Sequence, residues 1–255
     1  MIRPPAIVIS APGTNRDGEA AFALERAGAD VSIVTLADLA VQPQRLEQAR
    51  LVAIAGGFSY GDALGSGRLF ALELAAAVTD GLQQSVQAGR PVIGICNGFQ
   101  MLVRAGLLCA PDLDVMLDRN ASGRFECRWV QLDAPTSTCV WTAGLDEALL
   151  TPVAHGEGRF RAGATTLAML EREGRVALRY ASAPTVAAKG AYPDNPNGSD
   201  HDIAGICDVT GLVLGLMPHP EDHVVARQHP QRTRGRTDGN CLALFRNGVD
   251  YARNA

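Results

Sequence analysis

The sequence predicts an α/β fold in which a mostly parallel sheet is flanked by helices, with a smaller antiparallel extension. Two observations indicate it. The N-terminal 100 residues alternate short apolar runs with helix-like stretches, and strands that alternate with helices pair in parallel. The stretch from Arg124 to Tyr180 contains shorter strand-like runs separated by polar turns, which is typical of antiparallel pairing.

Individual elements follow from local patterns. Apolar and β-branched runs predict strands of the parallel part at residues 6–10, 31–36, 51–55, 92–95 and 212–216. Two helix-like stretches, residues 17–27 and 69–88, end before Gly28 and Gly89, because glycine readily adopts the left-handed conformation of a helix C-cap. Candidate strands of the antiparallel extension span residues 125–132 and 176–180.

The composition indicates one globular domain over residues 1–255. A hydrophobic content of 47% and a charged content of 20% are ordinary for a folded protein. The net charge of -4 argues against nucleic acid as a partner. No apolar run reaches the roughly 18 residues of a membrane span, and no export signal is evident, so we expect a cytoplasmic protein with no membrane association.

Cysteine, histidine and lysine patterns bear on cofactors. The 6 cysteines show no C-x-x-C pair or zinc-type spacing, which favours reduced thiols. His219 and His223 have i, i+4 spacing, but Pro220 disfavours a helix through them, and we interpret His155 as structural. Lys189 lies outside any P-loop motif. We therefore expect no metal and no cofactor in this chain.

The strongest catalytic candidate is Cys96, in the motif Gly-Ile-Cys-Asn-Gly-Phe-Gln between an apolar run and a helix-like stretch. A nucleophile on a sharp strand-to-helix turn needs small flanking residues, which Gly94 and Gly98 supply. The N-terminus of the following helix favours the reactive thiolate. The alternative is that Cys96 is a small buried hydrophobic residue.

A second motif, Met-Pro-His-Pro-Glu at residues 217–221, follows the apolar run 212–216. Because both prolines disfavour a helix, we expect an extended stretch with His219 and Glu221 on one side. A catalytic thiol needs a base, and the base needs an orienting acceptor. His219 and Glu221 suit these roles. The alternative is a proline-rich turn with two solvated polar residues.

A third motif, Ala-Gly-Gly-Phe-Ser-Tyr-Gly-Asp at residues 55–62, follows another strand. We interpret the backbone N–H of Gly57 as half of an oxyanion hole and that of Asn97 as the other half. All three motifs come at the carboxyl ends of strands, where parallel sheets bind their ligands. The alternative is that the paired glycines form an ordinary tight turn.

Together the three motifs resemble the class I glutamine amidotransferases, which use a Cys-His-Glu triad and have a flavodoxin-like fold. Further segments resemble, along nearly the whole chain, the glutaminase subunits of phosphoribosylformylglycinamidine synthase. These segments are residues 12–15, 57–62, 122–130, 153–160, 195–199 and 203–207.

This resemblance implies a role for each motif. Cys96 attacks the side-chain carboxamide of glutamine, and His219, oriented by Glu221, protonates the departing ammonia. The oxyanion is stabilised by the backbone N–H groups of Gly57 and Asn97.

The resemblance also implies a substrate pocket and partners. Phe58 and Gln100 are expected to shape the glutamine pocket. A separate synthetase subunit, which carries ATP and magnesium, would use the ammonia to aminate formylglycinamide ribonucleotide in purine biosynthesis, and a small bridging subunit is typical. Residues 222–239 look longer than in most members. We interpret the segment from Arg227 to Arg236 as a surface loop, or as a contact with an acidic partner or a phosphate.

Two other function classes stay open. A peptidase-like hydrolase would share the elbow cysteine and histidine without needing a partner, and glutamine-specific turnover would distinguish it. A non-catalytic scaffold subunit would retain the fold, but decay of the triad would then be expected, and Cys96, His219 and Glu221 are intact.

Overall fold

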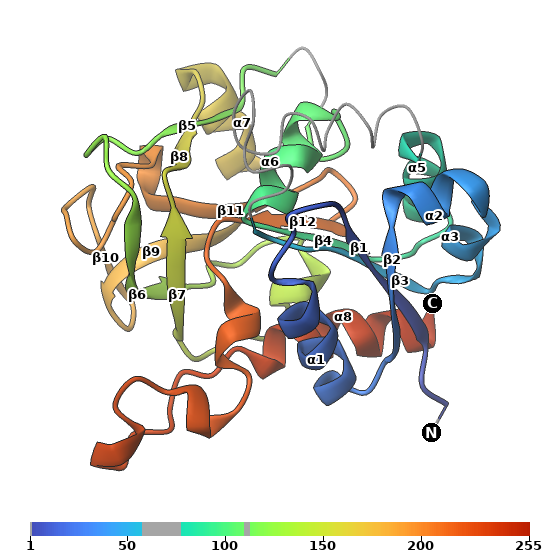
Figure 1. The fold of residues 1–255 in the computed structure, drawn as a ribbon. Helices are drawn as coiled ribbons and strands as arrows, with labels where there is room; N and C mark the ends of the chain where they lie inside the picture. The colour runs from blue at the N-terminus through green and yellow to red at the C-terminus, as the bar shows by residue number, and fades with distance from the viewer. Residues whose placement is uncertain (1, 58–77, 110–112) are drawn as a thin grey trace.

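The computed structural model describes residues 2–57, 78–109 and 113–255 (Figure 1). Within these ranges a central sheet separates two layers of helices. Figure 1 shows α6 (Asn97–Arg104) on one side of the sheet and α1 (Asp17–Ala27) with α8 (Leu242–Asn254) on the other. The described chain contains four further α-helices: α2 (Leu36–Val41), α3 (Gln44–Gln48), α5 (Thr79–Gln87) and α7 (Ala164–Arg172).

The main sheet has the strand order β2-β1-β3-β4-β12-β11-β9-β6-β7, and β10 pairs with β9. Neighbours from β2 to β12 are parallel, and neighbours from β12 to β7 are antiparallel. The strands of the parallel part are β1 (Pro5–Ser10), β2 (Asp30–Thr35), β3 (Leu51–Ile54), β4 (Val92–Ile95) and β12 (Val213–Leu216).

The antiparallel part continues the same sheet. Its strands are β6 (Glu126–Asp133), β7 (Leu149–His155), β9 (Val176–Ala183), β10 (Val186–Ala187) and β11 (Ile203–Cys207). A separate two-stranded ladder joins β5 (Met116–Arg119) to β8 (Glu157–Arg161). The predicted fold class, a mostly parallel sheet with a smaller antiparallel extension, is confirmed.

Local patterns explain several boundaries. Helix α1 ends as predicted at Gly28, whose φ of 104° is left-handed and whose N–H donates to the carbonyl of Glu25 at 3.0 Å. The long helix expected at residues 69–88 falls partly outside the described residues, and α5 begins at Thr79.

The centre of the sheet is completely buried, because β3, β4 and β12 are apolar and covered on both faces. Helix α6 packs closely there: a Cβ on Gly215 would lie 2.2 Å from the ring of Phe99. The register pairs Val92 with both Val52 and Val213, so these three strands end at the same edge of the sheet. The loops that follow them therefore converge.

The remaining short elements are 3-10 helices: η2 (Val140–Thr142), η3 (Asp200–Asp202), η4 (Pro220–His223), η5 (Ala226–Gln228) and η6 (Arg232–Arg234). The last two belong to a segment that projects from the body in Figure 1. Arg227, Arg232, Arg234 and Arg236 are exposed there, as expected for a surface loop.

Candidate active site

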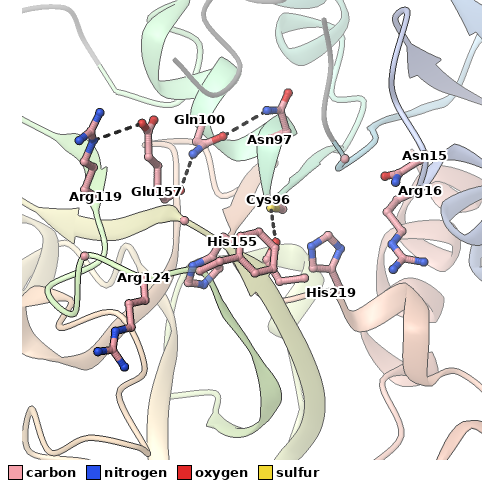
Figure 2. Close-up of a pocket in the computed structure, with 15 residues that line it drawn as sticks. Asn15, Arg16, Cys96, Asn97, Gln100, Arg119, Arg124, His155, Glu157 and His219 are labelled. Atoms are coloured by element: carbon pink, nitrogen blue, oxygen red, sulfur yellow. Dashed lines mark hydrogen bonds and ion pairs between the residues drawn. The ribbon is translucent and has the colours of Figure 1, made fainter. Parts of the chain in front are cut away.

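The loops after β3, β4 and β12 surround a cavity of about 360 Å³ (Figure 2). Cys96 and His219 both line it, and so do Gly57 and Asn97. The other lining residues come from the N-terminal loop, from α6 and from the antiparallel part: Asn15, Arg16, Gln100, Arg119, Gly123, Arg124, Phe125, Ala154, His155, Gly156 and Glu157.

Cys96 occupies a sharp elbow between β4 and α6. Its φ of 51° and ψ of -104° are unusual for a residue with a side chain. Two backbone hydrogen bonds hold it: its N–H donates to the carbonyl of Leu216 at 2.8 Å, and its own carbonyl accepts from the N–H of Gln100 at 3.1 Å. Cys96 is only 7% exposed and lines the cavity.

The glycines around the elbow are required by close packing. A Cβ on Gly94 would lie 2.4 Å from Cδ1 of Leu102, and one on Gly98 would lie 2.2 Å from the carbonyl oxygen of Ile54. Neither distance is tolerable for carbon. The expectation that small residues flank the nucleophile elbow is therefore met for a specific steric reason.

His219 and Glu221 form a buried pair. Nδ1 of His219 lies 2.7 Å from Oε1 of Glu221, and their side chains are 3% and 0% exposed. Burial alone would lower the pKa of the His219 imidazole, but electrostatic and hydrogen-bond interactions with Glu221 and Cys96 outweigh it and hold this pKa well above its ordinary value. The arrangement favours an imidazolium beside Cys96.

The backbone around this pair differs from the extended stretch that the sequence predicted. Pro220 begins the 3-10 helix η4, which includes Glu221. The prediction was wrong because proline suits the first position of a helical turn, where its missing N–H would have no partner anyway. His219 stays non-helical, with φ of -106° and ψ of 78°, and its N–H donates to the carbonyl of Pro152 at 2.8 Å. The turn brings the Glu221 carboxylate to the imidazole.

The two glycines after β3 lie against the other site residues. A Cβ on Gly56 would lie 2.9 Å from Cε1 of His219 and 3.3 Å from Cβ of Cys96. Gly57 has a left-handed φ of 124°, and its Cβ would lie 2.5 Å from Oδ1 of Asn15. Phe58, the predicted pocket residue that follows, lies outside the described residues. Gly56 is thus the residue that lets the imidazole and the elbow approach each other.

Gln100 is buried and connects α6 to β8. Its Nε2 donates to the carbonyl of Glu157 at 2.5 Å, and its Oε1 accepts from Nδ2 of Asn97 at 3.4 Å. Gln100 lines the cavity as predicted, but both polar ends of its amide have protein partners. It joins α6 to β8 at the wall of the cavity.

His155 is the lining residue that sequence reasoning undervalued. Its Nδ1 lies 3.1 Å from Oδ1 of Asn120, and Nδ2 of Asn120 donates to the carbonyls of His155 and Arg124. Oδ1 of Asn120 must therefore accept, which puts the His155 proton on Nδ1. Burial, together with the charge of His219, lowers the pKa of His155 to about 3, so the ring stays neutral. The available signal was its position in a loop of small residues.

Charged groups surround the cavity. Nη1 of Arg16 lies 3.1 Å from Oε1 of Glu19 and 3.7 Å from Oδ1 of Asp222. On the other side, Nε of Arg119 lies 3.8 Å from Oε1 of Glu157. Burial and repulsion by the Glu221 carboxylate raise the pKa of Asp222 to about 6.

The described part of the chain shows neither a metal-binding cluster nor a membrane-spanning helix. In residues 2–57, 78–109 and 113–255, no group of three or more His, Cys, Asp or Glu side chains is arranged to hold a metal ion. Within the same ranges, no helix has the length and apolar character needed to cross a membrane.

Comparison with known proteins identifies the family to which this chain belongs. Residues 3–252 match the family described as the CobB/CobQ-like glutamine amidotransferase domain. The chain is 44% identical to phosphoribosylformylglycinamidine synthase subunit PurQ of Treponema denticola, covering 98% of this chain and 99% of the relative. It is 40% identical to the same subunit of Dehalococcoides mccartyi, covering 99% of each.

Solved structures show the same likeness. A chain in the structure of PurLQS from Thermotoga maritima aligns with a TM-score of 0.75 and 33% identity, covering 98% of this chain and 99% of that one. A glutamine amidotransferase from Thermotoga maritima aligns over 100% of both chains with a TM-score of 0.53 and 14% identity, which shows the fold alone. The predicted glutamine amidotransferase fold is confirmed.

Proposed function

Because this chain belongs to the glutamine amidotransferase family, among the PurQ subunits of phosphoribosylformylglycinamidine synthase, we propose that it hydrolyses glutamine through Cys96, His219 and Glu221. The observation that carries the assignment of these residues is the buried 2.7 Å contact between His219 and Glu221 beside the elbow cysteine. The products are glutamate and ammonia.

In the first step the Cys96 thiolate attacks the side-chain carboxamide carbon of glutamine. The raised pKa of His219 keeps its proton in place until the amide nitrogen departs, and His219 then donates that proton so that ammonia leaves. A thioester between Cys96 and the glutamyl group remains. Glu221 accepts a hydrogen bond from Nδ1 of His219 and so orients the ring throughout.

In the second step water hydrolyses the thioester. His219, now neutral, takes a proton from the water, and the resulting hydroxide attacks the thioester carbonyl. The sulfur leaves as the Cys96 thiolate, glutamate departs, and His219 is again protonated. The backbone N–H groups of Gly57 and Asn97 stabilise the oxyanion in both steps, since both residues line the cavity beside the sulfur.

The ammonia is used by a partner. The Thermotoga maritima structure is that of an assembly named PurLQS, and this chain aligns with one of its subunits. We propose that this chain likewise delivers ammonia to an ATP-dependent synthetase that converts formylglycinamide ribonucleotide to formylglycinamidine ribonucleotide, together with a small bridging subunit. ATP and magnesium belong to the synthetase. The setting is the cytoplasm, where thiols stay reduced.

The test is glutamate release from glutamine by the wild-type chain and by Cys96→Ala, each alone and with the synthetase assembly. Cys127→Ala, which removes an exposed thiol, is the matched control. Glutamate release and ribonucleotide amination that require Cys96 but tolerate Cys127→Ala support the proposal. If neither wild type nor Cys96→Ala releases glutamate with the partners present, while ammonium salts still drive amination, Cys96 is structural and the chain is a scaffold.

A further inference from the structure

The charged groups around the cavity are distributed unevenly. In Figure 2, His219 and Arg16 lie on one side of Cys96, and Arg119, Arg124 and Glu157 lie on the other. Among the described lining residues, Glu157 is the one carboxylate. The side of the cavity away from His219 therefore offers one anion and two cations.

These charges are complementary to the α-ammonium and the α-carboxylate of an amino acid whose side chain ends in a carboxamide. When the carboxamide of glutamine lies at Cys96, its Cα carries an ammonium and a carboxylate at the other end. An ammonium that leaves water needs a charged partner, because burial without one is costly. Resting on the proposed function, we propose that Glu157 binds the α-ammonium of glutamine and restricts the site to amides that carry one.

Backbone contacts hold Glu157 in place for this role. It is the first residue of β8, where it pairs with Arg119 of β5. Its carbonyl accepts from Nε2 of Gln100, which lies on the helix that begins just after Cys96. These contacts connect the backbone of Glu157 to the helix that follows the elbow.

The Glu157 side chain is also suitable chemically. It is 24% exposed, so it is partly desolvated yet reachable from the cavity. Nε of Arg119 lies 3.8 Å from its Oε1, an ion pair without hydrogen-bond length. A carboxylate accepts several hydrogen bonds at once, so it can bind an ammonium while this pair persists. Arg119 and Arg124 supply positive charge for the α-carboxylate.

The experiment compares two substrates in two variants, with the chain in its synthetase assembly. Glutamine is compared with 5-amino-5-oxopentanoate, which keeps the carboxamide and the carboxylate but lacks the ammonium. Glu157→Gln keeps the shape of the side chain and the backbone contact to Gln100 and removes the charge. Asp118→Asn is the matched control, because it removes a carboxylate from β5 that pairs with Arg161 and does not line the cavity.

Glu157→Gln is expected to lower kcat/KM for glutamine by about 10- to 100-fold, mainly through KM, because a charge-assisted hydrogen bond is lost. For 5-amino-5-oxopentanoate the loss should stay below about threefold, since there is no ammonium to couple with the carboxylate. Asp118→Asn should change neither value by more than about twofold. Glu157→Asp should show the same substrate-dependent loss, but smaller.

An equal loss on both substrates would overturn the proposal, because Glu157 would then act only on the shape of the pocket. An unchanged kcat/KM for glutamine would overturn it too. Failure of the proposed function would look different. In that case wild type itself would release no glutamate from glutamine, and both proposals would be wrong.

Discussion

In the parallel half of the sheet the site residues come directly after the strands, with Cys96 one residue beyond β4 and His219 three residues beyond β12. In the antiparallel half, taken here together with the separate β5–β8 ladder, they lie on β7, on β8 and in the loop that follows β5, as His155, Glu157 and Arg124 do. The first group includes the nucleophile and its base, and the second forms the wall of the cavity.

The difference has a physical cause. Parallel strands in register end side by side at one edge of the sheet. The backbone pairing therefore fixes the relative positions of the residues that directly follow these strands. Hairpin residues depend on side-chain contacts for their position, for example Asn120 with His155. We therefore expect changes in the parallel half to lower kcat and changes in the antiparallel half to raise KM or lower stability.

The largest effect expected in the parallel half comes from Glu221→Gln, which should lower kcat by about 1,000- to 10,000-fold because His219 loses its orienting carboxylate. The pKa of His219 should fall as well. Since the imidazolium is the proton donor and is lost when pH rises through its pKa, the alkaline limb of the pH profile should move to lower pH. Steady-state glutaminase assays across pH measure both effects. An unmoved alkaline limb would contradict this account of His219.

Gly56→Ala should have the next largest effect. Its Cβ would lie 2.9 Å from Cε1 of His219, so the ring must shift, and displacements of about 1 Å cost about 100-fold in rate. Gly18→Ala is the control, because nothing lies within 4 Å of its added Cβ. Comparison of kcat for the two variants tests the point. Wild-type kcat in Gly56→Ala would show that the His219 ring has room that the structure does not indicate.

Asn197→Ala tests the antiparallel half. The buried Asn197 amide donates to the carbonyl of Gly158 and to the hydroxyl of Tyr180, and it accepts from Ser199. Its loss should lower the free energy of unfolding by about 2–4 kcal/mol and raise KM about tenfold through displacement of β8, with kcat nearly retained.

Urea denaturation and steady-state kinetics measure these changes for Asn197→Ala, and Asn254→Ala in the exposed last turn of α8 is the control. If Asn197→Ala lowered kcat as much as Gly56→Ala does, the expected difference between the two halves of the sheet would be contradicted.

The smallest effect is a change in the pH dependence of stability. His155 is neutral in the folded protein down to about pH 3, whereas in the unfolded chain its pKa is about 6.5. Between these values the unfolded state binds more protons, so stability falls as pH falls from about 6.5 toward about 3. His155→Gln should reduce this decline. Urea titrations at pH 7 and pH 4.5 measure it, and identical slopes for wild type and variant would show that His155 is not buried as a neutral ring.

Much of the site follows from local sequence because its constraints are local. Gly94 and Gly98 around Cys96 are required by packing within one elbow, and the predicted strand at 92–95 matches β4. The run 212–216 and the residues after it likewise indicate a strand followed by a polar pair. Residues in such motifs are constrained by neighbours close in the chain, so their pattern can be read without the fold.

The predictions that failed or fell short depended on contacts between distant segments. The stretch with His219 and Glu221 was expected to be extended, but Pro220 begins η4, and the N–H of His219 donates to the carbonyl of the distant Pro152. The interpretation of His155 as structural stays a prediction, and its contact with Asn120, 35 residues away, could not be read from the sequence. Gln100 was expected to shape the glutamine pocket, and it lines the cavity, but the sequence did not show that Glu157 and Asn97 engage its amide.

The sequence by itself determined the α/β fold class, the elbow around Cys96 and the family of this chain, because alternating strands and helices, required glycines and motif residues are properties of neighbouring positions. Only the tertiary structure decided how Glu221 meets His219, why Gly56 must lack a side chain and which residues form the far wall of the cavity. Those contacts exist only when strands far apart in the chain pair and bring their loops to one edge of the sheet.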